Sequence, residues 1–244
     1  KSTVLKTISG LLTPTEGNIT FDGETIGGSN PAALVDMGVI QVPEGRRVFP
    51  GLNVEDNLKV ANYGKSPDLL EEGLETVYKK FPILQERRKQ AAGLLSGGQQ
   101  QMLGLAMALH SKPKVLLIDE LSLGLAPAVV ERILPVIKQI ADQGTAIIIV
   151  EQSVNLALTI ADRAYFMEKG QIRFNGSTKD LLNRPDLLRS VFLSNTPISA
   201  VETSSNPSTT ESITILEIED VTRSFGGIRA VSSVTFDVRS NEIK

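Results

Sequence analysis

Apolar residues along the chain fall into uninterrupted runs and into helical periods, and the two kinds alternate. Residues 115–118 form an apolar run that ends in two carboxylates, and residues 146–150 form a second run of the same kind. Runs of this length without a polar interruption are typical of parallel strands that are buried on both faces. Between them, Pro127 opens a helical stretch that continues to about residue 142. The alternation predicts an α/β fold with a parallel sheet.

Shorter elements precede the first buried run. Helical spacing predicts a helix over residues 4–12, and strands are expected over 18–22 and over 38–42, the second after a short helix that Pro31 opens. Residues from 53 to about 95 are charged and mostly helical in pattern. We therefore expect a helical insert between the first strands and the buried one.

The last third of the chain combines a hairpin, a polar stretch and two further strands. Alternating positions predict a hairpin over 164–175, and Ser177 with Asp180 forms a capping box that predicts a helix after it. Residues 195–212 are rich in Ser, Thr and Pro and nearly free of large apolar groups, which is typical of a linker. Beyond it, residues 214–239 alternate apolar and polar positions as two β-strands.

Composition narrows the classes of protein that fit these elements. The chain has 244 residues, no cysteine and a formal net charge of −3. That charge gives no argument for nucleic-acid binding, and the lack of cysteine excludes disulfides and thiolate metal sites. No apolar run approaches the roughly 20 residues that span a bilayer, so any association with a membrane requires a partner.

The pentad Leu-Ser-Gly-Gly-Gln at residues 95–99 stands directly before an apolar helical pattern. Adjacent Gly97 and Gly98 let the backbone approach a ligand closely, because they carry no Cβ. A helix N-terminus presents free N–H groups and the positive end of its dipole, which suits an anion. Asp119 and Glu120 are expected at the carboxyl end of their strand, where open α/β sheets bind ligands. An anion site and a carboxylate pair suited to Mg²⁺ together predict a nucleotide phosphate site.

Each motif alone has a structural explanation, a flexible turn in one case and a strand that ends at the surface in the other. In this order and spacing, however, they resemble a single family. The pentad LSGGQ is similar to the signature motif of ABC ATPases, and VLLIDE at 115–120 looks like their Walker B strand. The resemblance implies a P-loop NTPase core of α/β class with a parallel sheet, a helical subdomain at about 53–95 and an antiparallel β portion that the C-terminal strands complete.

The first residues of the chain fit the same family. A P-loop ends in Gly-Lys-Ser/Thr and leads into a helix, with the lysine at the β- and γ-phosphates and the hydroxyl at Mg²⁺. By this resemblance Lys1, Ser2 and Thr3 bind ATP at the end of such a loop, and Ser2 also binds Mg²⁺. No glycines of the loop and no Met precede Lys1, so we expect a piece of a longer protein.

The resemblance also implies roles at other positions. Asp119 binds Mg²⁺ through its hydration shell, and Glu120 polarises the attacking water. Glu44 stands where most ABC ATPases carry the Q-loop glutamine that links the nucleotide to the membrane subunit. Gln152 stands where most carry the switch histidine, and its amide can donate to a γ-phosphate oxygen but carries no titrating proton. The active unit is a dimer, in which the ATP of one domain is contacted by the signature residues of the other, here Ser96, Gly97, Gly98 and Gln99.

Within the family, residues 1–194 resemble the second ATPase of the pair that serves branched-chain amino acid uptake. The segments that carry this resemblance are VPEGRRVFP at 42–50, NVEDNL at 53–58, SLGLAP at 122–127 and VEQ at 150–152. Two departures bear on turnover, because Leu121 replaces the usual Pro after the Walker B glutamate and Met107 stands where relatives often carry Arg. His110 is expected to be a helix C-terminal residue that the dipole favours.

Residues 213–244 resemble the start of another ABC ATPase domain and stop where its P-loop strand would begin. The linker at 195–212 would then join two domains of a tandem polypeptide, whereas a natural circular permutant would have the same order and a plain C-terminal hairpin is the structural alternative. We expect residues 214–239 to fold back and join strand 18–22 in one antiparallel sheet. Phe225 would then stack on the adenine of ATP.

The function that the resemblance implies is an ATP-binding and ATP-hydrolysing subunit that energises an ABC importer for branched-chain amino acids. Its partners would be a second ABC ATPase domain, transmembrane permease subunits and, indirectly, a substrate-binding protein, with no nucleic acid. It would lie peripherally at the cytoplasmic face of the plasma membrane. Two alternatives stay open: a soluble ABC ATPase of DNA maintenance or translation, whose long arm insertions are missing here, and a truncated nucleotide-binding module without turnover.

Overall fold

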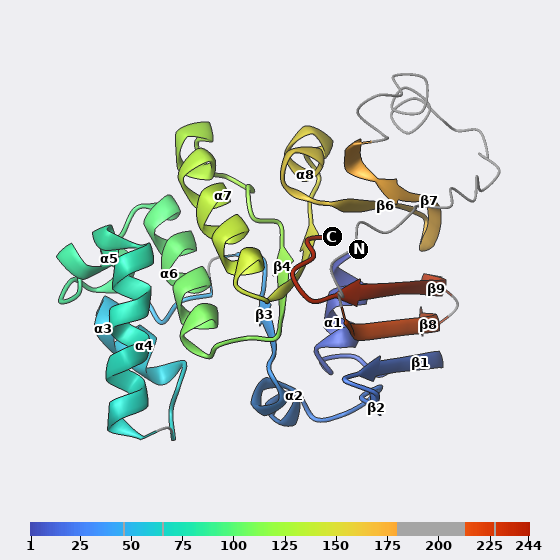
Figure 1. Cartoon of the computed structure of the whole chain (residues 1–244), viewed down its shortest axis with the longest axis horizontal. Helices are drawn as coiled ribbons and strands as arrows, with labels where there is room; N and C mark the ends of the chain where they lie inside the picture. Colours follow the sequence, from blue (N-terminus) through green and yellow to red (C-terminus); the bar gives the residue numbers. More distant parts are fainter. Residues whose placement is uncertain (46, 65, 180–212, 227) are drawn as a thin grey trace.

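The structure is a computed structural model that describes residues 1–45, 47–64, 66–179, 213–226 and 228–244 (Figure 1). Its elements, in chain order, are α1 (Ser2–Ile8), β1 (Glu16–Phe21), β2 (Glu24–Thr25), α2 (Pro31–Met37), β3 (Val39–Val42), α3 (Val54–Val60), α4 (Pro67–Lys80), α5 (Pro82–Glu86), a 3₁₀ turn η1 (Ala92–Leu94), α6 (Gly97–His110), β4 (Val115–Asp119), α7 (Pro127–Asp142), β5 (Ala146–Val150), α8 (Val154–Ile160), β6 (Arg163–Glu168), β7 (Gln171–Ser177), β8 (Thr214–Phe225) and β9 (Ile228–Arg239). Asp180 of the predicted capping box, the helix expected after it and the linker at 195–212 lie outside the described residues.

A parallel sheet of order β3-β4-β5 forms the centre of the molecule. Every residue of β4 is buried. Leu116 and Ile118 point into one hydrophobic core, whereas Val115 and Leu117 point into a second one on the other face. Because successive side chains of a strand alternate between its faces, a strand buried on both sides must be apolar throughout. The predicted α/β fold with a parallel sheet is confirmed.

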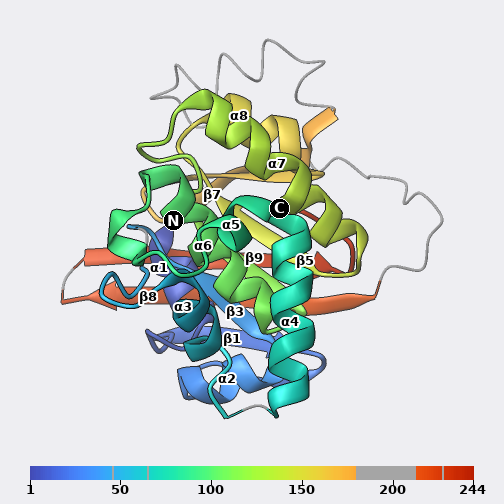
Figure 2. The ribbon, with the colours of Figure 1, turned by 90° about the vertical axis from the view of Figure 1, so that its left-hand side faces the viewer.

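One face of this sheet is covered by α6 and α7, and the helical insert α3, α4 and α5 packs against α6 (Figures 1 and 2). Buried apolar residues from the insert and from α6 meet in one core, which includes Leu58, Val77, Leu84 and Leu103. The expected helical subdomain is therefore present. Among the described helices, none combines the length and the apolar character that crossing a bilayer requires.

His110 lies at the C-terminal end of its helix, as expected, and makes further contacts. It is the last residue of α6, but only 5% of its surface is exposed. Its Nδ1 faces the side-chain amide of Asn62, and its Nε2 lies 3.1 Å from the Leu70 carbonyl oxygen of α4. The imidazole is thus a packing and hydrogen-bonding group between α6 and the insert, in addition to its place at a helix C-terminus.

The other face is covered by α1 and by an antiparallel sheet of order β2-β1-β8-β9. The strands β1 and β8 pair with Ile19 opposite Ile218 and Phe21 opposite Leu216, and all four side chains are buried. The prediction that residues 214–239 fold back onto strand 18–22 is confirmed. Figure 1 shows the two ends of the sequence, drawn in blue and red, side by side in this sheet.

The last three residues extend the parallel sheet, which the sequence pattern did not predict. Ile243 forms a parallel bridge with Ile147 of β5, and the Lys244 N–H donates to the Ile147 carbonyl at 2.7 Å. On the other side, the Asp162 N–H donates to the Ile243 carbonyl at 2.9 Å. Residues 242–244 therefore form hydrogen bonds on both edges, next to the strand β5 that precedes Glu151 and Gln152.

Candidate active site

The start of α1 lies against the carboxyl end of β4. Ser2, the first residue of α1, donates from its hydroxyl to Oδ1 of Asp119 at 3.0 Å. The Lys1 ammonium, one residue earlier, donates to the Glu151 carbonyl oxygen at 3.3 Å. Three segments that are distant in the sequence, at residues 1–2, 119–120 and 151–152, therefore meet at one edge of the parallel sheet. The sequence predicted this meeting only through the family resemblance.

Asp119 is enclosed, with 2% of its surface exposed. Burial raises the pKa of its carboxyl above the ordinary value, the hydrogen bond from Ser2 opposes the rise, and the adjacent Glu120 charge adds to it. A carboxylate that is costly to ionise gains from a nearby cation, because opposite charge stabilises the ionised form. The site is therefore suited to a positive charge next to Asp119.

Glu120 has an unusual backbone. Its φ is 54°, in the left-handed region, where a residue with a Cβ carries roughly 1–3 kcal/mol of strain. The Glu120 N–H donates to the Val150 carbonyl at 2.9 Å, and the Gln152 side-chain amide donates to Oε1 of Glu120 at 2.5 Å. Glu120 and Gln152, the two predicted catalytic residues, are therefore in direct contact. The hydrogen bond between them involves Oε1 of Glu120 and not Oε2.

The turn after Glu120 is fastened to the same neighbouring loop. The Glu151 carboxylate accepts two hydrogen bonds from Ser122, one from the backbone N–H and one from the hydroxyl, both at 2.9 Å. Leu121 is buried in the core between these points. Sequence reasoning assigned no role to Glu151, which it noted only as part of the segment VEQ at 150–152.

The signature residues form the N-terminus of α6, as predicted. Ser96 and Gln99 make a reciprocal capping box, in which the Ser96 hydroxyl accepts from the Gln99 N–H at 3.3 Å and the Gln99 side chain accepts from the Ser96 N–H at 3.0 Å. A Cβ on Gly98 would lie 2.6 Å from Cγ1 of Val129 in α7, so this glycine permits the close packing of two helices. Gly97 is partly accessible at the first helical position.

The signature and the Ser2–Asp119 contact lie on different faces of the parallel sheet. The helix α6 belongs to the core on one face, and α1 belongs to the core on the other. Figure 1 shows the two helices on opposite sides of β3 and β4. Within one chain, therefore, the described residues do not bring the signature to the phosphate end of α1.

Two other predicted residues, Glu44 and Phe225, are exposed. Glu44 follows β3 at the same carboxyl edge as Asp119, because Val42 pairs with Ile118. Phe225 ends β8 with 46% of its surface exposed, and the Arg223 guanidinium lies 4.7 Å from its ring centroid. Thr3 lies within α1. Among the described residues, neither the Thr3 side chain nor Phe225 forms a hydrogen bond with Ser2 or Asp119.

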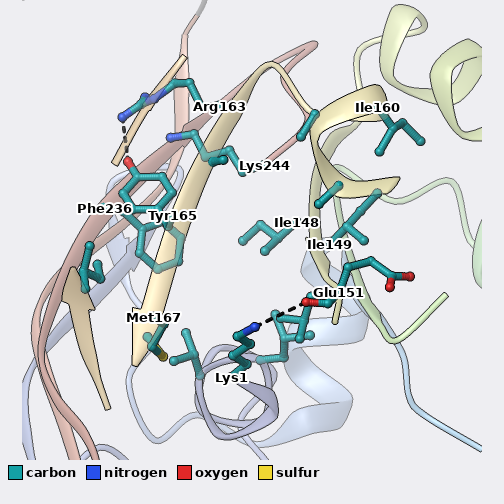
Figure 3. Close-up of a pocket in the computed structure, with 17 residues that line it drawn as sticks. Lys1, Ile148, Ile149, Glu151, Ile160, Arg163, Tyr165, Met167, Phe236 and Lys244 are labelled. Atoms are coloured by element: carbon teal, nitrogen blue, oxygen red, sulfur yellow. Dashed lines mark hydrogen bonds between the residues drawn. The ribbon is translucent and has the colours of Figure 1, made fainter. Parts of the chain in front are cut away.

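A cavity of about 130 Å³ opens beside Lys1 (Figure 3). Its walls are mainly aliphatic, from α1, β5, α8 and β6, and both Lys1 and Lys244 line it. Figure 3 shows the Lys1 ammonium directed to the Glu151 carbonyl at one end of the cavity and Lys244 at the other. The two ends of the chain thus border one space.

Comparisons with known proteins agree with this geometry. The family model described as ABC transporter matches residues 1–122. Over 185 residues the chain is 42% identical to the high-affinity branched-chain amino acid transport ATP-binding protein BraG of Pseudomonas aeruginosa. The aligned residues cover 76% of this chain and 79% of that protein. The chain is 38% identical to the probable branched-chain amino acid transport ATP-binding protein LivF of Archaeoglobus fulgidus, over 75% of this chain and 78% of that protein.

Solved structures are similar in fold. The ADP conformation of MJ1267, an ATP-binding cassette of an ABC transporter, superposes with a TM-score of 0.65 at 26% identity, over 79% of this chain and 82% of that chain. A nucleotide-free ATP-binding cassette from an ABC transporter has a TM-score of 0.68 at 24% identity, over 80% and 83% of the two chains. The sequence match and the shared architecture together show that this chain belongs to the ABC transporter family.

Proposed function

We propose that the chain binds and hydrolyses ATP to energise an ABC importer whose cargo is branched-chain amino acids. The observation that carries the proposal is the 3.0 Å bond between the first hydroxyl of α1 and a buried strand-end carboxylate, with a second carboxylate next to it. The cargo is suggested by the two relatives named above, which are 42% and 38% identical. An ATPase domain does not itself contact the cargo, so this part rests on likeness alone.

The residues at the end of β4 fit Mg²⁺. The ion prefers hard oxygen ligands and is usually bound by one or two carboxylates together with substrate phosphates and waters. The hydroxyl of Ser2 and the desolvated carboxylate of Asp119 supply such oxygens from two elements that already touch. Ser2 and Asp119 would hold Mg²⁺, whose positive charge would stabilise the charge that develops on the transferred phosphoryl group.

Other side chains of this chain would bind the phosphates of ATP and position the attacking water. Lys1 would attract the β- and γ-phosphates, and Thr3 would support the same end of α1. Glu120 would accept a hydrogen bond from the attacking water through Oε2, since its Oε1 is bonded to Gln152. The Gln152 amide has two N–H donors, so it can keep Glu120 in place with one and donate to a γ-phosphate oxygen with the other.

The signature residues would act on the ATP of a facing cassette. They lie across the parallel sheet from Ser2, so one chain alone leaves each half of the site without the other. The exposed N-terminus of α6 presents the free N–H groups and the positive dipole end that suit a γ-phosphate. A dimer of cassettes supplies both halves. Phe225 would stack on the adenine at the edge of the antiparallel sheet.

A permease would dock beside the Glu44 turn. A groove lined by Ile40, Val42, Pro43, Met107 and Ala108, among others, separates β3 from α6 at this edge. Such an apolar groove suits a helix from a membrane subunit, which would hold the chain peripherally at the cytoplasmic face of the membrane. Because the chain has no cysteine, Val35→Cys at the groove should crosslink to a permease, whereas Lys138→Cys on α7 should not. Equal yields from both would contradict this docking.

We also propose that residues 213–244 originate as the first strands of a second ABC ATPase domain, joined through 195–212 to a cassette that covers 1–194. The observation in favour is that β8 and β9 complete the antiparallel sheet of the cassette. A longer transcript that encodes a second P-loop after Lys244 would support this origin. A reading frame that closes without one would contradict it.

The test of hydrolysis is Glu120→Gln in the full-length gene product. The amide keeps the shape of the side chain but loses the charge that polarises water, so turnover should fall by a factor of at least about 10² while Mg-ATP binding remains. The matched control is Asp142→Asn, which replaces an exposed carboxylate at the end of α7 with an amide and should leave turnover unchanged. Turnover like that of the unmodified protein in Glu120→Gln would refute the assignment.

A further inference from the structure

Glu151 and Gln152, consecutive residues after β5, form hydrogen bonds with two positions of the turn after β4. Gln152 bonds the side chain of Glu120, and the adjacent Glu151 accepts both the N–H and the hydroxyl of Ser122. Glu151 is 8% exposed, so a carboxylate is buried here and satisfied by a single serine. We propose that Glu151 is a positioning residue, which fixes the turn at residues 120–122 and thereby the direction of the Glu120 carboxylate. This inference rests on the proposed function, because it concerns the aim of the hydrolytic group.

The turn needs an external restraint for two reasons. Glu120 has a φ of 54°, which a residue with a side chain leaves readily unless neighbours fix it. The next residue is Leu121, whose φ is free, and not the proline that would fix it through its ring. Burial of Leu121 anchors the side chain of the turn, but it leaves the peptide at residue 122 to be oriented by hydrogen bonds.

The bonds that supply this restraint come from consecutive residues. The Val150 carbonyl accepts from the Glu120 N–H at 2.9 Å, and Oε1 of Glu151 accepts from the Ser122 N–H at 2.9 Å. The turn is therefore tied at both ends to the end of β5, so that Glu120 and Gln152 face each other. Lys1 donates to the backbone carbonyl of the same Glu151, which links the phosphate-binding end of α1 to this loop as well.

A positioning role of Glu151 and an effect of its negative charge predict different results for Glu151→Gln. The amide oxygen of Gln can accept from the Ser122 N–H, and its NH₂ can donate to the Ser122 hydroxyl, which has lone pairs to accept with. Both contacts survive in neutral form. Glu151→Ala removes both, and Ser122→Ala removes only the bond from the hydroxyl. If position is what Glu151 provides, Gln must rescue what Ala loses.

The test measures kcat and KM for ATP in the full-length gene product. Glu151→Ala should lower kcat by about 10- to 100-fold with KM changed less than about 3-fold, because a misdirected carboxylate affects the chemical step more than ATP binding. Glu151→Gln should retain kcat to within about 3-fold. Ser122→Ala should lower kcat several-fold, and Ser153→Ala, a serine of the same loop that caps α8, should not lower it.

The outcomes separate this inference from the proposed function. If Glu120→Gln abolishes turnover but Glu151→Ala keeps a normal kcat, the positioning role is wrong and the hydrolytic assignment stands. If Glu120→Gln has normal turnover, the proposed function itself is wrong. Loss of kcat in Glu151→Gln equal to that in Glu151→Ala would overturn the inference in favour of a charge effect. Should Glu151→Ala not fold, Ser122→Ala carries the test, and an unchanged kcat there overturns the inference.

Discussion

At the scale of residues, the buried side chains of Asp119, Glu151 and Lys244 each have a polar or charged partner. Lys244 is the clearest case, because its side chain is only 2% exposed. Its ammonium lies 3.4 Å from Oδ1 of Asp237 and 3.5 Å from Oε2 of Glu242. Burial nevertheless lowers the pKa of Lys244 to about 8, and the two carboxylates only partly oppose this. Nearby, burial raises the pKa of Tyr165 to about 12.

These two shifts predict how stability depends on pH. Between about pH 8 and pH 10, unfolded chains keep a proton on Lys244 that the folded protein has lost, so the free energy of unfolding should rise with pH, by at most about 1.4 kcal/mol per unit. Above pH 10 the sign reverses at Tyr165, because the folded protein keeps the phenol proton that the unfolded chain loses. Urea unfolding of the 244-residue chain at pH 8, 9 and 10, followed by circular dichroism, measures the first trend.

Lys244→Met is the variant that isolates this effect. It should flatten the rise between pH 8 and pH 10, whereas Lys138→Met on the exposed side of α7 should leave the rise as it is. A rise of the same slope in Lys244→Met would mean that other groups cause it.

At the scale of elements, the contact between α4 and α6 depends on one glycine and one histidine. A Cβ on Gly73 of α4 would fall on the His110 ring, whereas a Cβ on Gly104 of α6 would meet nothing within 4 Å. The His110 ring is fixed by Asn62 and by the Leu70 carbonyl, so it cannot easily move away. The same exchange at the two glycines should therefore have opposite effects.

Gly73→Ala should destabilise the fold by about 1–3 kcal/mol, the usual cost of overpacking. Gly104→Ala should stabilise it by up to about 1 kcal/mol, because alanine is the better helix former. In a chain of this size the two variants should shift the melting temperature by several degrees in opposite directions. Thermal unfolding by calorimetry decides the matter, and a shift of the same sign in both variants would contradict the packing argument.

Most elements were predictable because their patterns are local. The continuous apolar run of β4, the helix N-terminus at Gly97 and the helix after Pro127 each follow from a few consecutive residues. The hydrogen bond between Glu151 and Ser122 joins residues 29 positions apart and depends on the geometry of the turn, so no local sequence pattern predicts it. His110 has the same sequence context whether it is exposed or buried, and only the close approach of Gly73 distinguishes the two.

At the scale of the whole molecule, strands from the first and the last part of the sequence form one antiparallel sheet, of order β2-β1-β8-β9. The strands β8 and β9 pair with β1 in this sheet, and residues 242–244 lie beside β5. Lys244 and Lys1 then border one cavity (Figure 3). The chain thus ends in a parallel bridge to β5 and begins with the helix α1, and a glycine-rich phosphate loop connects a strand to a helix in a P-loop.

This arrangement predicts that a loop between Lys244 and Lys1 creates a nucleotide site. The design joins the two residues through a short apolar stretch and a Gly-x-x-x-x-Gly sequence directly before Lys1, and opens the chain between Ser204 and Ser205. The loop would add the backbone N–H groups that cradle phosphates, while Ser2 and Asp119 already touch. Isothermal titration with Mg-ATP should give micromolar affinity for the rejoined chain and at least 10-fold weaker binding for the original 244 residues. Lys1→Ala in the rejoined chain should remove most of the gain, and equal affinity in all three proteins would show that this end of the molecule is not where ATP binds.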